Sequence, residues 1–175
     1  IIVAAEGVHF TDDKGRTILD GMSGLWCCGA GHNRHEVTAA VQAQMQTLSY
    51  APPFQFGHPG AFELANKVKS LTPDGLDYVF FTNSGSDAVD TSLKMARGYW
   101  RQKGMGTKTK LIGRAKGYHG MNFGGMAVGG IGPNRKLFGP VIDVDHLSHT
   151  ISRDMAFSRG MPSSGWEMAD ELSGL

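Results

Sequence analysis

A run of small polar residues, Thr82-Asn83-Ser84-Gly85-Ser86-Asp87-Ala88, directly follows the apolar run Tyr78-Val79-Phe80-Phe81. We expect the apolar run to be a strand buried on both faces and the polar turn to open a helix. The first N–H groups of a helix lack intrahelical partners and carry partial positive charge, so such a turn can bind a phosphate. Gly85 lets a ligand approach the backbone, and Ser84 and Ser86 add hydroxyl donors. A phosphorylated ligand is the first hypothesis.

The helix expected after this turn carries an apolar stripe. The stripe recurs at steps of four, three and four residues, at Val89, Leu93, Ala96 and Trp100. Asp87 falls in the first turn of the helix, where a carboxylate suits the dipole but would repel a phosphate. We therefore expect the Asp87 side chain to point away from the ligand. The alternative is that Ser84 or Ser86 is only a helix N-cap.

A second loop carries side chains that suit a flat ligand. Lys110-Leu111-Ile112-Gly113 predicts a short strand, and the segment 114–120 after it presents Tyr118 and His119 between glycines. Ligands of parallel sheets bind beyond the carboxyl ends of the strands, so we expect this loop and the loop after Thr82 to face one crevice. Tyr118 could stack there on a heteroaromatic ring while His119 forms hydrogen bonds at its rim. Alternatively, Tyr118 is an ordinary half-buried tyrosine and His119 caps the loop.

The other elements position these loops within an α/β fold. We expect a hairpin of 8–11 and 17–20 around a turn at 12–15, a Gly-rich loop over 21–32, helices near 34–48 and 60–71, a Pro- and aromatic-rich loop over 50–59, a third strand at 141–144 and a helix from 167. Strands that alternate with helices imply parallel pairing, with helices on both faces of the sheet.

Composition disfavours several other classes of function. Among 175 residues, 17 basic and 16 acidic side chains form no Lys/Arg cluster, so nucleic-acid binding is disfavoured. No stretch approaches the roughly 20 apolar residues that span a membrane. Cys27 and Cys28 are adjacent and have no other cysteine to pair with, which fits a reduced compartment, the cytoplasm. His146 and His149 lack a second group of ligands, so we expect a plain loop and no metal.

Motifs for other cofactors are absent or incomplete. The turn at 82–86 lacks the G-x-G-x-x-G fingerprint of dinucleotide binding. The segment 104–109 fails the spacing of a P-loop because Thr107 separates the glycine from the lysine. The segment 21–25 lacks the closing glycine of a G-x-S-x-G nucleophile elbow. NAD, ATP and serine-hydrolase functions are therefore disfavoured.

Four motifs together resemble the class III aminotransferases. They are Asp20-Gly21-x-Ser23-Gly24-Leu25-Trp26-Cys27, Gly31-His32, the run from Thr82 to Asp90, and Gly113-Arg114-x-x-Gly117-Tyr118-His119-Gly120. Within that class the chain is similar to the ω-amino acid, or β-alanine, pyruvate aminotransferases, which use pyridoxal phosphate. The resemblance runs almost from end to end and keeps the order and spacing of the motifs.

The resemblance implies a role for each residue of the two loops. Ser84, Gly85 and Ser86 match the turn that holds the cofactor phosphate. Tyr118 matches the aromatic residue that lies against the pyridine ring, and His119 lies beside it. One position departs from the pattern, because many members carry glutamate where this chain has Asp87.

The resemblance also implies a substrate pocket and a partner subunit. Leu25 and Trp26 match the wall of the pocket, where a large indole limits the side chain that can enter. The loop with Tyr50, Phe54 and Phe56 resembles the segment that reaches toward the neighbouring active site, which implies a homodimer or a dimer of dimers. An aromatic-rich loop would suit such an interface, although it could equally cover a core.

The implied fold is the fold type I of pyridoxal-phosphate transferases. Residues 1–50 would be the N-terminal segment of the small domain and residues 51–175 the first part of the large, mostly parallel-sheet domain. The family's cofactor lysine, its aspartate and its substrate arginine are expected beyond residue 175, so this segment should hold no catalytic residue and should not transaminate by itself. We favour a fragment of an aminotransferase that uses an amine donor and pyruvate. The alternative is a non-catalytic truncated paralogue that binds a phosphorylated ligand or serves in dimerisation.

Overall fold

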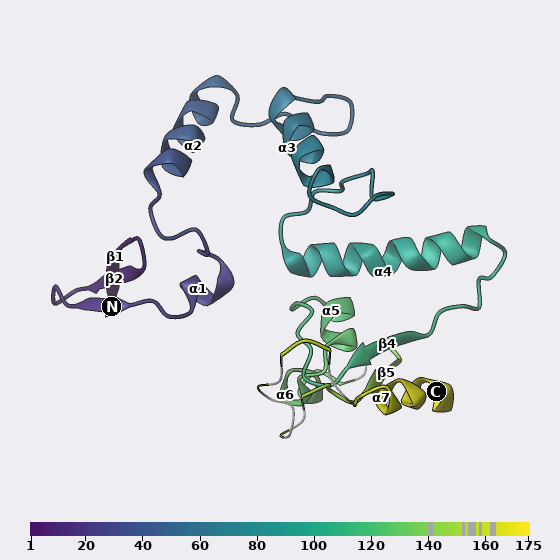
Figure 1. Ribbon diagram of the computed structural model, residues 1–175. Helices are drawn as coiled ribbons and strands as arrows, with labels where there is room; N and C mark the ends of the chain where they lie inside the picture. Colours follow the sequence, from purple (N-terminus) through teal and green to yellow (C-terminus); the bar gives the residue numbers. More distant parts are fainter. Residues whose placement is uncertain (140–141, 152, 154–156, 158, 162–163) are drawn as a thin grey trace. The chain divides into compact units, whose positions relative to one another are not determined.

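The computed structural model divides the chain into two compact units, Ile1–Val79 and Phe80–Leu175. It describes residues 1–139, 142–151, 153, 157, 159–161 and 164–175. The boundary between these units, at 79/80, differs from the domain boundary predicted at 50/51. The predicted boundary refers to the two domains of the complete family fold, and it stays a prediction. Figure 1 traces the chain through both units.

The first unit begins with a three-stranded antiparallel sheet. Strand β1 (Ile2–Glu6) pairs with β2 (His9–Asp12), which pairs with β3 (Thr17–Leu19) in the register His9↔Leu19. The hairpin predicted from the sequence is therefore confirmed. Strand β1 is an addition to that prediction, formed by an N-terminal apolar run that continues the β-branched pattern.

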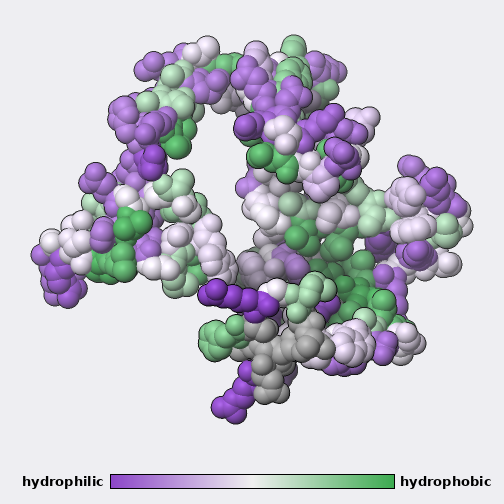
Figure 2. Space-filling model, in the orientation of Figure 1, coloured by the Kyte–Doolittle hydropathy of each residue, from purple (hydrophilic) through white to green (hydrophobic). Residues whose placement is uncertain are grey.

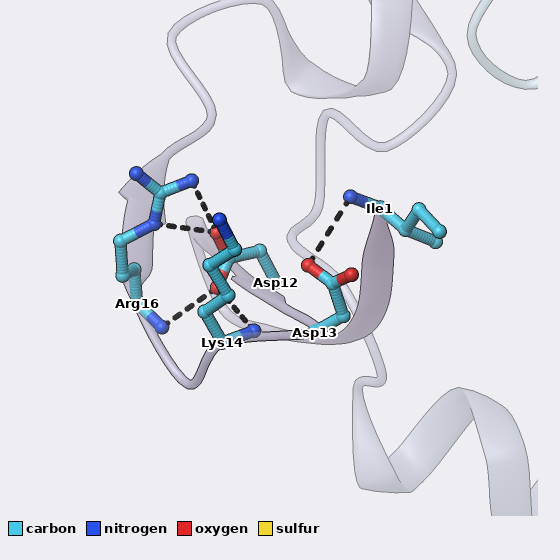
Figure 3. A network of polar contacts seen from close by, with 5 residues as sticks. All are labelled: Ile1, Asp12, Asp13, Lys14 and Arg16. Carbon is cyan, nitrogen blue, oxygen red and sulfur yellow. Dashed lines mark hydrogen bonds and ion pairs between the residues drawn. The ribbon is translucent and has the colours of Figure 1, made fainter.

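The turn between β2 and β3 is held by Asp12, whose side chain is only 3% exposed (Figure 3). Its Oδ1 accepts the backbone N–H groups of Lys14 at 2.9 Å and Arg16 at 2.8 Å, and its Oδ2 accepts the Arg16 guanidinium at 2.6 Å. The hydrogen bonds from Arg16, aided by the N–H of Lys14, hold the pKa of Asp12 below its ordinary value against the opposing effect of burial. The neighbouring Asp13 forms only a looser ion pair with the amino group of Ile1, at 3.4 Å.

Three helices follow in the first unit. A single irregular turn, α1 (Ser23–Trp26), lies within the Gly-rich loop, and α2 (His35–Thr47) and α3 (Pro59–Lys69) fall close to the predicted ranges. Proline at the start of α3 fits the first helical position, where no intrahelical N–H bond is lost.

The second unit has the alternating order expected of an α/β fold. Helix α4 (Gly85–Gln102) precedes β4 (Leu111–Arg114), and α5 (Phe123–Val128) and α6 (Gly132–Lys136) precede β5 (Val144–Leu147); α7 (Glu167–Asp170) and a 3-10 turn (Glu171–Gly174) close the described chain. The two strands pair in parallel, as predicted, with Leu111 opposite Val144. Helix α5 packs against both strands and against α4.

The third strand lies later than the sequence analysis predicted. Strand β5 begins at Val144, the last residue of the expected run 141–144, and extends to Leu147. Ile142 and Asp143 precede the ladder, and Val141 lies outside the described residues. In the ladder with β4, Gly113 lies opposite His146, and a Cβ at Gly113 would collide with the Val128 carbonyl of α5.

The prediction of a buried strand at Tyr78–Phe81 is wrong for this structure. These residues form no ladder with another described strand, and Tyr78 and Phe80 are 97% and 68% exposed. A strand needs a neighbour for its N–H and C=O groups, and the described strands of the second unit, β4 and β5, pair with each other. The apolar composition of this run favours a strand, but none of the described strands pairs with it.

The described residues bury little apolar surface. Ala127 and Val128 of α5 are the buried apolar side chains, and they lie where α5 crosses β4. Figure 2 shows hydrophobic residues, in green, on the visible face of the molecule. Among the described residues, none of the helices is both long and apolar enough to cross a membrane.

Candidate functional site

The start of α4 has the geometry of a capped helix N-terminus. Ser84 is the N-cap, because its backbone is extended and its Oγ accepts the N–H of Asp87 at 3.1 Å. The Ser84 carbonyl accepts the N–H of Ala88 at 3.0 Å, and the Thr82 hydroxyl donates to the same carbonyl at 3.0 Å. The capping role considered for Ser84 is therefore confirmed, whereas Ser86 lies inside the helix.

Two N–H donors at this end of α4 are left for another group. The N–H groups of Gly85 and Ser86 have no acceptor among the described residues, while those of the next two residues are satisfied by Ser84. Helix α4 is 18 residues long, so its dipole adds partial positive charge at this point. The donor pair therefore suits an anion that approaches along the helix axis.

The loop after β4 is attached directly to this end of α4. The N–H of Met121 donates to the Ser86 Oγ at 3.0 Å, and the Asn122 side-chain amide donates to the Asp87 carboxylate at 3.1 Å. One turn further along, Asp90 Oδ1 accepts the N–H of Gly125 at 2.8 Å. The loops after Thr82 and after Gly113 are therefore in direct contact, and the common crevice expected between them stays a prediction.

Gly120 makes the closest approach between the loop and the helix. A Cβ at this position would lie 2.7 Å from the Ser86 Cα, and its φ of +110° is unfavourable for any other residue. Glycine is therefore required here for two independent reasons. This contact sets the distance between the loop that carries Tyr118 and the start of α4.

Tyr118 and His119 line a small pocket in this loop, together with Gly117, Gly120, Gly125, Met126, Gly129, Ile131 and Asn134. The Tyr118 side chain is 54% exposed, which leaves its ring accessible to a flat group. The alternative of an ordinary half-buried tyrosine also fits this exposure, so the stacking role of Tyr118 stays a prediction. His119 contacts Gly117, where a Cβ would lie 3.1 Å from its Nε2.

The donors at the start of α4 fit the phosphate of pyridoxal phosphate. The Ser86 hydroxyl accepts from Met121, so its own O–H is free to donate to an anion, beside the two unpaired N–H groups. The Asp87 carboxylate accepts a hydrogen bond from the Asn122 side-chain amide, and its orientation away from a phosphate stays a prediction. The described residues thus offer hydrogen-bond donors at the start of α4, where we predict the phosphate.

The residues expected at the substrate pocket lie in the first unit. Leu25 and Trp26 belong to the α1 turn, and the Trp26 side chain is 80% exposed. Tyr50, Phe54 and Phe56 lie in the connection between α2 and α3, and their side chains are exposed. The roles of these five residues at the pocket and at a partner subunit stay predictions.

The sequence analysis missed the contacts that join the loop to the helix. Asn122 and Asp90 were not singled out, although a polar residue at position 90, one step from the apolar Val89, marks a side chain with a specific partner. Met121 contributes only its backbone N–H, for which the residue type gives no signal.

His146 takes part in a structural contact and not in a group of metal ligands. Its Nδ1 accepts from the Arg135 guanidinium at 3.1 Å, so its Nε2 carries the hydrogen that is donated to the Gly129 carbonyl at 2.9 Å. Among the residues that the structure describes, no three His, Cys, Asp or Glu side chains are grouped as metal ligands would be.

Comparison with known proteins identifies the family of this chain. The family described as "Aminotransferase class-III" matches residues 1–159. The chain is 60% identical over 173 residues to the β-alanine–pyruvate aminotransferase of Pseudomonas aeruginosa and 58% identical over 174 residues to the ω-amino acid–pyruvate aminotransferase of Pseudomonas putida. Each alignment covers 98% of this chain, which spans 39% of the length of either relative.

A solved structure has the same fold. The amine transaminase from an uncultivated Pseudomonas species, determined in its PLP-bound form, superposes with a TM-score of 0.78 at 37% identity, over 85% of this chain and 34% of its own. This chain belongs to the class III aminotransferases. Its α/β fold is that of part of a PLP-dependent transaminase.

Proposed function

We propose that this chain is part of an enzyme that transfers an amino group from an ω-amino acid or amine of the β-alanine type to pyruvate, with pyridoxal phosphate as cofactor. The names of the two Pseudomonas relatives support both substrates. The observation that carries the proposal is the pair of unpaired N–H groups at Gly85 and Ser86, attached through Ser86 to the loop that presents Tyr118. Such a site combines an anion position with an accessible aromatic ring.

The proposed roles of the cofactor residues follow from their contacts. The N–H groups of Gly85 and Ser86 and the Ser86 hydroxyl would bind the phosphate, and Ser84 would hold the helix end in place by capping it. The Tyr118 ring would cover one face of the pyridine ring, with His119 beside it. The cofactor supplies an electron-withdrawing ring for amino transfer, and these residues anchor and orient it.

The remaining roles rest on the resemblance. Leu25 and Trp26 would form the wall that selects the amine donor, and Tyr50, Phe54 and Phe56 would reach a partner subunit in a homodimer or a dimer of dimers. The free Cys27 and Cys28 agree with a cytoplasmic location. Light scattering of the purified enzyme would test the dimer.

A hybrid enzyme provides the direct test of Tyr118. Residues 1–175 replace the matching segment of the Pseudomonas aeruginosa relative, to which they are 60% identical. We expect this hybrid to form alanine from β-alanine and pyruvate, and we expect the 175-residue chain by itself to be inactive. Replacement of Tyr118 by alanine in the hybrid should cause loss of bound cofactor on gel filtration, measured as phosphorus per chain.

The matched control is Tyr118→Phe, which keeps an aromatic ring. This variant should retain the cofactor, because stacking needs the ring and not the hydroxyl. Equal retention in the hybrid, in Tyr118→Ala and in Tyr118→Phe would remove the stacking role. An inactive hybrid that binds the cofactor normally would argue against the proposed substrates.

A further inference from the structure

The α1 turn holds four consecutive residues in the left-handed region of the backbone. The φ values of Ser23, Gly24, Leu25 and Trp26 are 51°, 60°, 61° and 70°. Only glycine adopts this region without steric cost, so the other three are strained. Strained backbone of this kind persists only where surrounding contacts determine it. The contacts that hold α1 therefore also determine the backbone conformation of Leu25 and Trp26, which lie in this turn.

Asp20 accepts hydrogen bonds from the backbone of this turn and of the residue just before it. Its Oδ1 accepts the N–H of Met22 at 3.1 Å, and its Oδ2 accepts the N–H of Gly24 at 2.6 Å. The same Oδ2 lies 2.7 Å from the His32 Nε2. An ionised carboxylate only accepts hydrogen bonds, so Nε2 carries the hydrogen in this pair. The carboxylate is 6% exposed and the imidazole 12%, so both are largely shielded from water.

The same contacts keep Asp20 ionised. The hydrogen bond from His32, together with those from Gly24 and Met22, holds the pKa of Asp20 below its ordinary value, although burial acts in the opposite direction. A carboxylate that accepts three hydrogen bonds is an effective clamp because each bond is charge-assisted.

Both partners are anchored on the β1–β3 sheet. His32 exchanges two backbone hydrogen bonds with Gly7, at 2.7 and 3.1 Å, and its ring lies 4.7 Å from the ring of Phe10. Asp20 directly follows β3 and donates its N–H to the carbonyl of Val8 at 2.9 Å. The sheet thus holds the two side chains that in turn hold the backbone of α1.

We propose that Asp20 and His32 are positioning residues, which hold the Ser23–Trp26 turn in its left-handed conformation and so fix the Leu25 and Trp26 side chains that select the amine donor. The selection of the donor rests on the proposed function. The hold on the turn rests only on the contacts above and can be tested without catalysis.

The first test uses the 175-residue chain and measures the motion of Trp26. Trp100→Phe and Trp166→Phe leave Trp26 as the only tryptophan, and its time-resolved fluorescence anisotropy reports the mobility of α1. We expect Asp20→Ala to cause loss of the slow component of the decay, because the strained turn relaxes. An unchanged decay in Asp20→Ala, with unchanged far-UV circular dichroism, would overturn the proposal.

The matched control is Asp12→Ala, which removes another buried carboxylate that accepts two backbone N–H groups in the same sheet. It lies at the β2–β3 turn and contacts no residue of α1 in the described structure, so Trp26 should keep its slow decay. At the other partner, His32→Gln keeps an N–H donor for Asp20 and should preserve the decay, whereas His32→Leu should not. Equal effects of Asp12→Ala and Asp20→Ala would mean that both act only through general stability.

The second test separates the hold on the turn from its use in catalysis. In the hybrid enzyme, Asp20→Ala should lower the preference in kcat/KM for β-alanine over a bulky benzylic amine by about tenfold, because the indole no longer closes the pocket. Trp26→Ala should lower it as well. If Trp26→Ala leaves the preference unchanged, the wall role in the proposed function fails. If only Asp20→Ala leaves it unchanged, the positioning role fails.

Discussion

At the scale of single residues, Ser84 and Ser86 have different roles at the start of α4. Ser84 satisfies an N–H of the helix, and Ser86 joins the helix to the following loop while keeping a hydroxyl donor. The backbone N–H groups of Gly85 and Ser86 have no acceptor among the described residues, at the end of the helix where its dipole is strongest. The proposed phosphate position thus rests on backbone N–H groups, with the two serine hydroxyls beside them.

Gly120 combines a positive φ with a close contact between its loop and α4. We predict that Gly120→Ala in the hybrid enzyme reduces cofactor retention, because the new Cβ would collide with Ser86 and push the Tyr118 loop away from α4. The control is Gly104→Ala, at a φ of +77° with open space around it, which should cost about 1 to 2 kcal/mol of stability and leave the cofactor bound. Gel filtration with phosphorus analysis compares the two. Full retention in Gly120→Ala would contradict the account.

The lowered pKa of Asp12 predicts that the stability of the β2–β3 hairpin depends on pH. Its pKa in the folded chain is lowered from 3.8, so its contribution to stability is complete above that pH and is lost as the pH falls through the lower, folded value. Asp12→Asn should therefore lower stability at neutral pH and flatten its acid dependence, measured by denaturant unfolding at several pH values. Asp13→Asn, at an exposed ion pair, should leave that profile nearly unchanged. Two parallel profiles for wild type and Asp12→Asn would refute this prediction.

At the scale of elements, the second unit depends on the close packing of α5 between α4 and the parallel strands. Gly113 of β4 leaves room for the Val128 carbonyl, and Gly124 and Gly125 leave room for Asp90 and His119. These glycines allow backbone groups to approach one another without side chains between them. The packing of α5 thus sets the position of the loop that precedes it, which carries Tyr118.

The packing of α5 can be tested by two substitutions of opposite expected sign. Gly113→Ala places a methyl group against the Val128 carbonyl and should destabilise the chain by about 1 to 3 kcal/mol. Gly98→Ala, inside α4 with open space around it, should instead stabilise it by about 0.5 to 1 kcal/mol. Denaturant unfolding followed by circular dichroism measures both. Destabilisation of equal size in the two variants would show that position 113 is not specific.

Local patterns in the sequence predict where a helix or strand lies better than they predict which other element it packs against or pairs with. The helical spacing of Val37, Val41 and Met45 and the N-cap at Ser84 depend on nearby residues, and both α2 and α4 lie where they are expected. The run Tyr78–Phe81 and the register of β5 depend on which strand lies alongside, which no local pattern contains. The site follows the same rule, because donors at 85 and 86 could be predicted, whereas the contacts of Asp90 and Asn122 could not.

At the scale of the whole molecule, the chain spans 39% of the length of its two Pseudomonas relatives and reproduces the fold of a PLP-bound transaminase over 85% of its own length. The second unit contains the proposed phosphate and ring positions, and the first contains the proposed donor-selecting turn. We therefore propose two binding functions for this part of the class III sequence, one for the cofactor and one for the amine donor.

The central claim is that the start of α4 binds the phosphate of the cofactor. A crystal structure of the hybrid enzyme with pyridoxal phosphate tests it most directly. We predict phosphate oxygens within hydrogen-bond distance of the N–H groups of Gly85 and Ser86, with the Tyr118 ring against the pyridine ring. A phosphate bound elsewhere, with these two N–H groups facing water, would contradict the account.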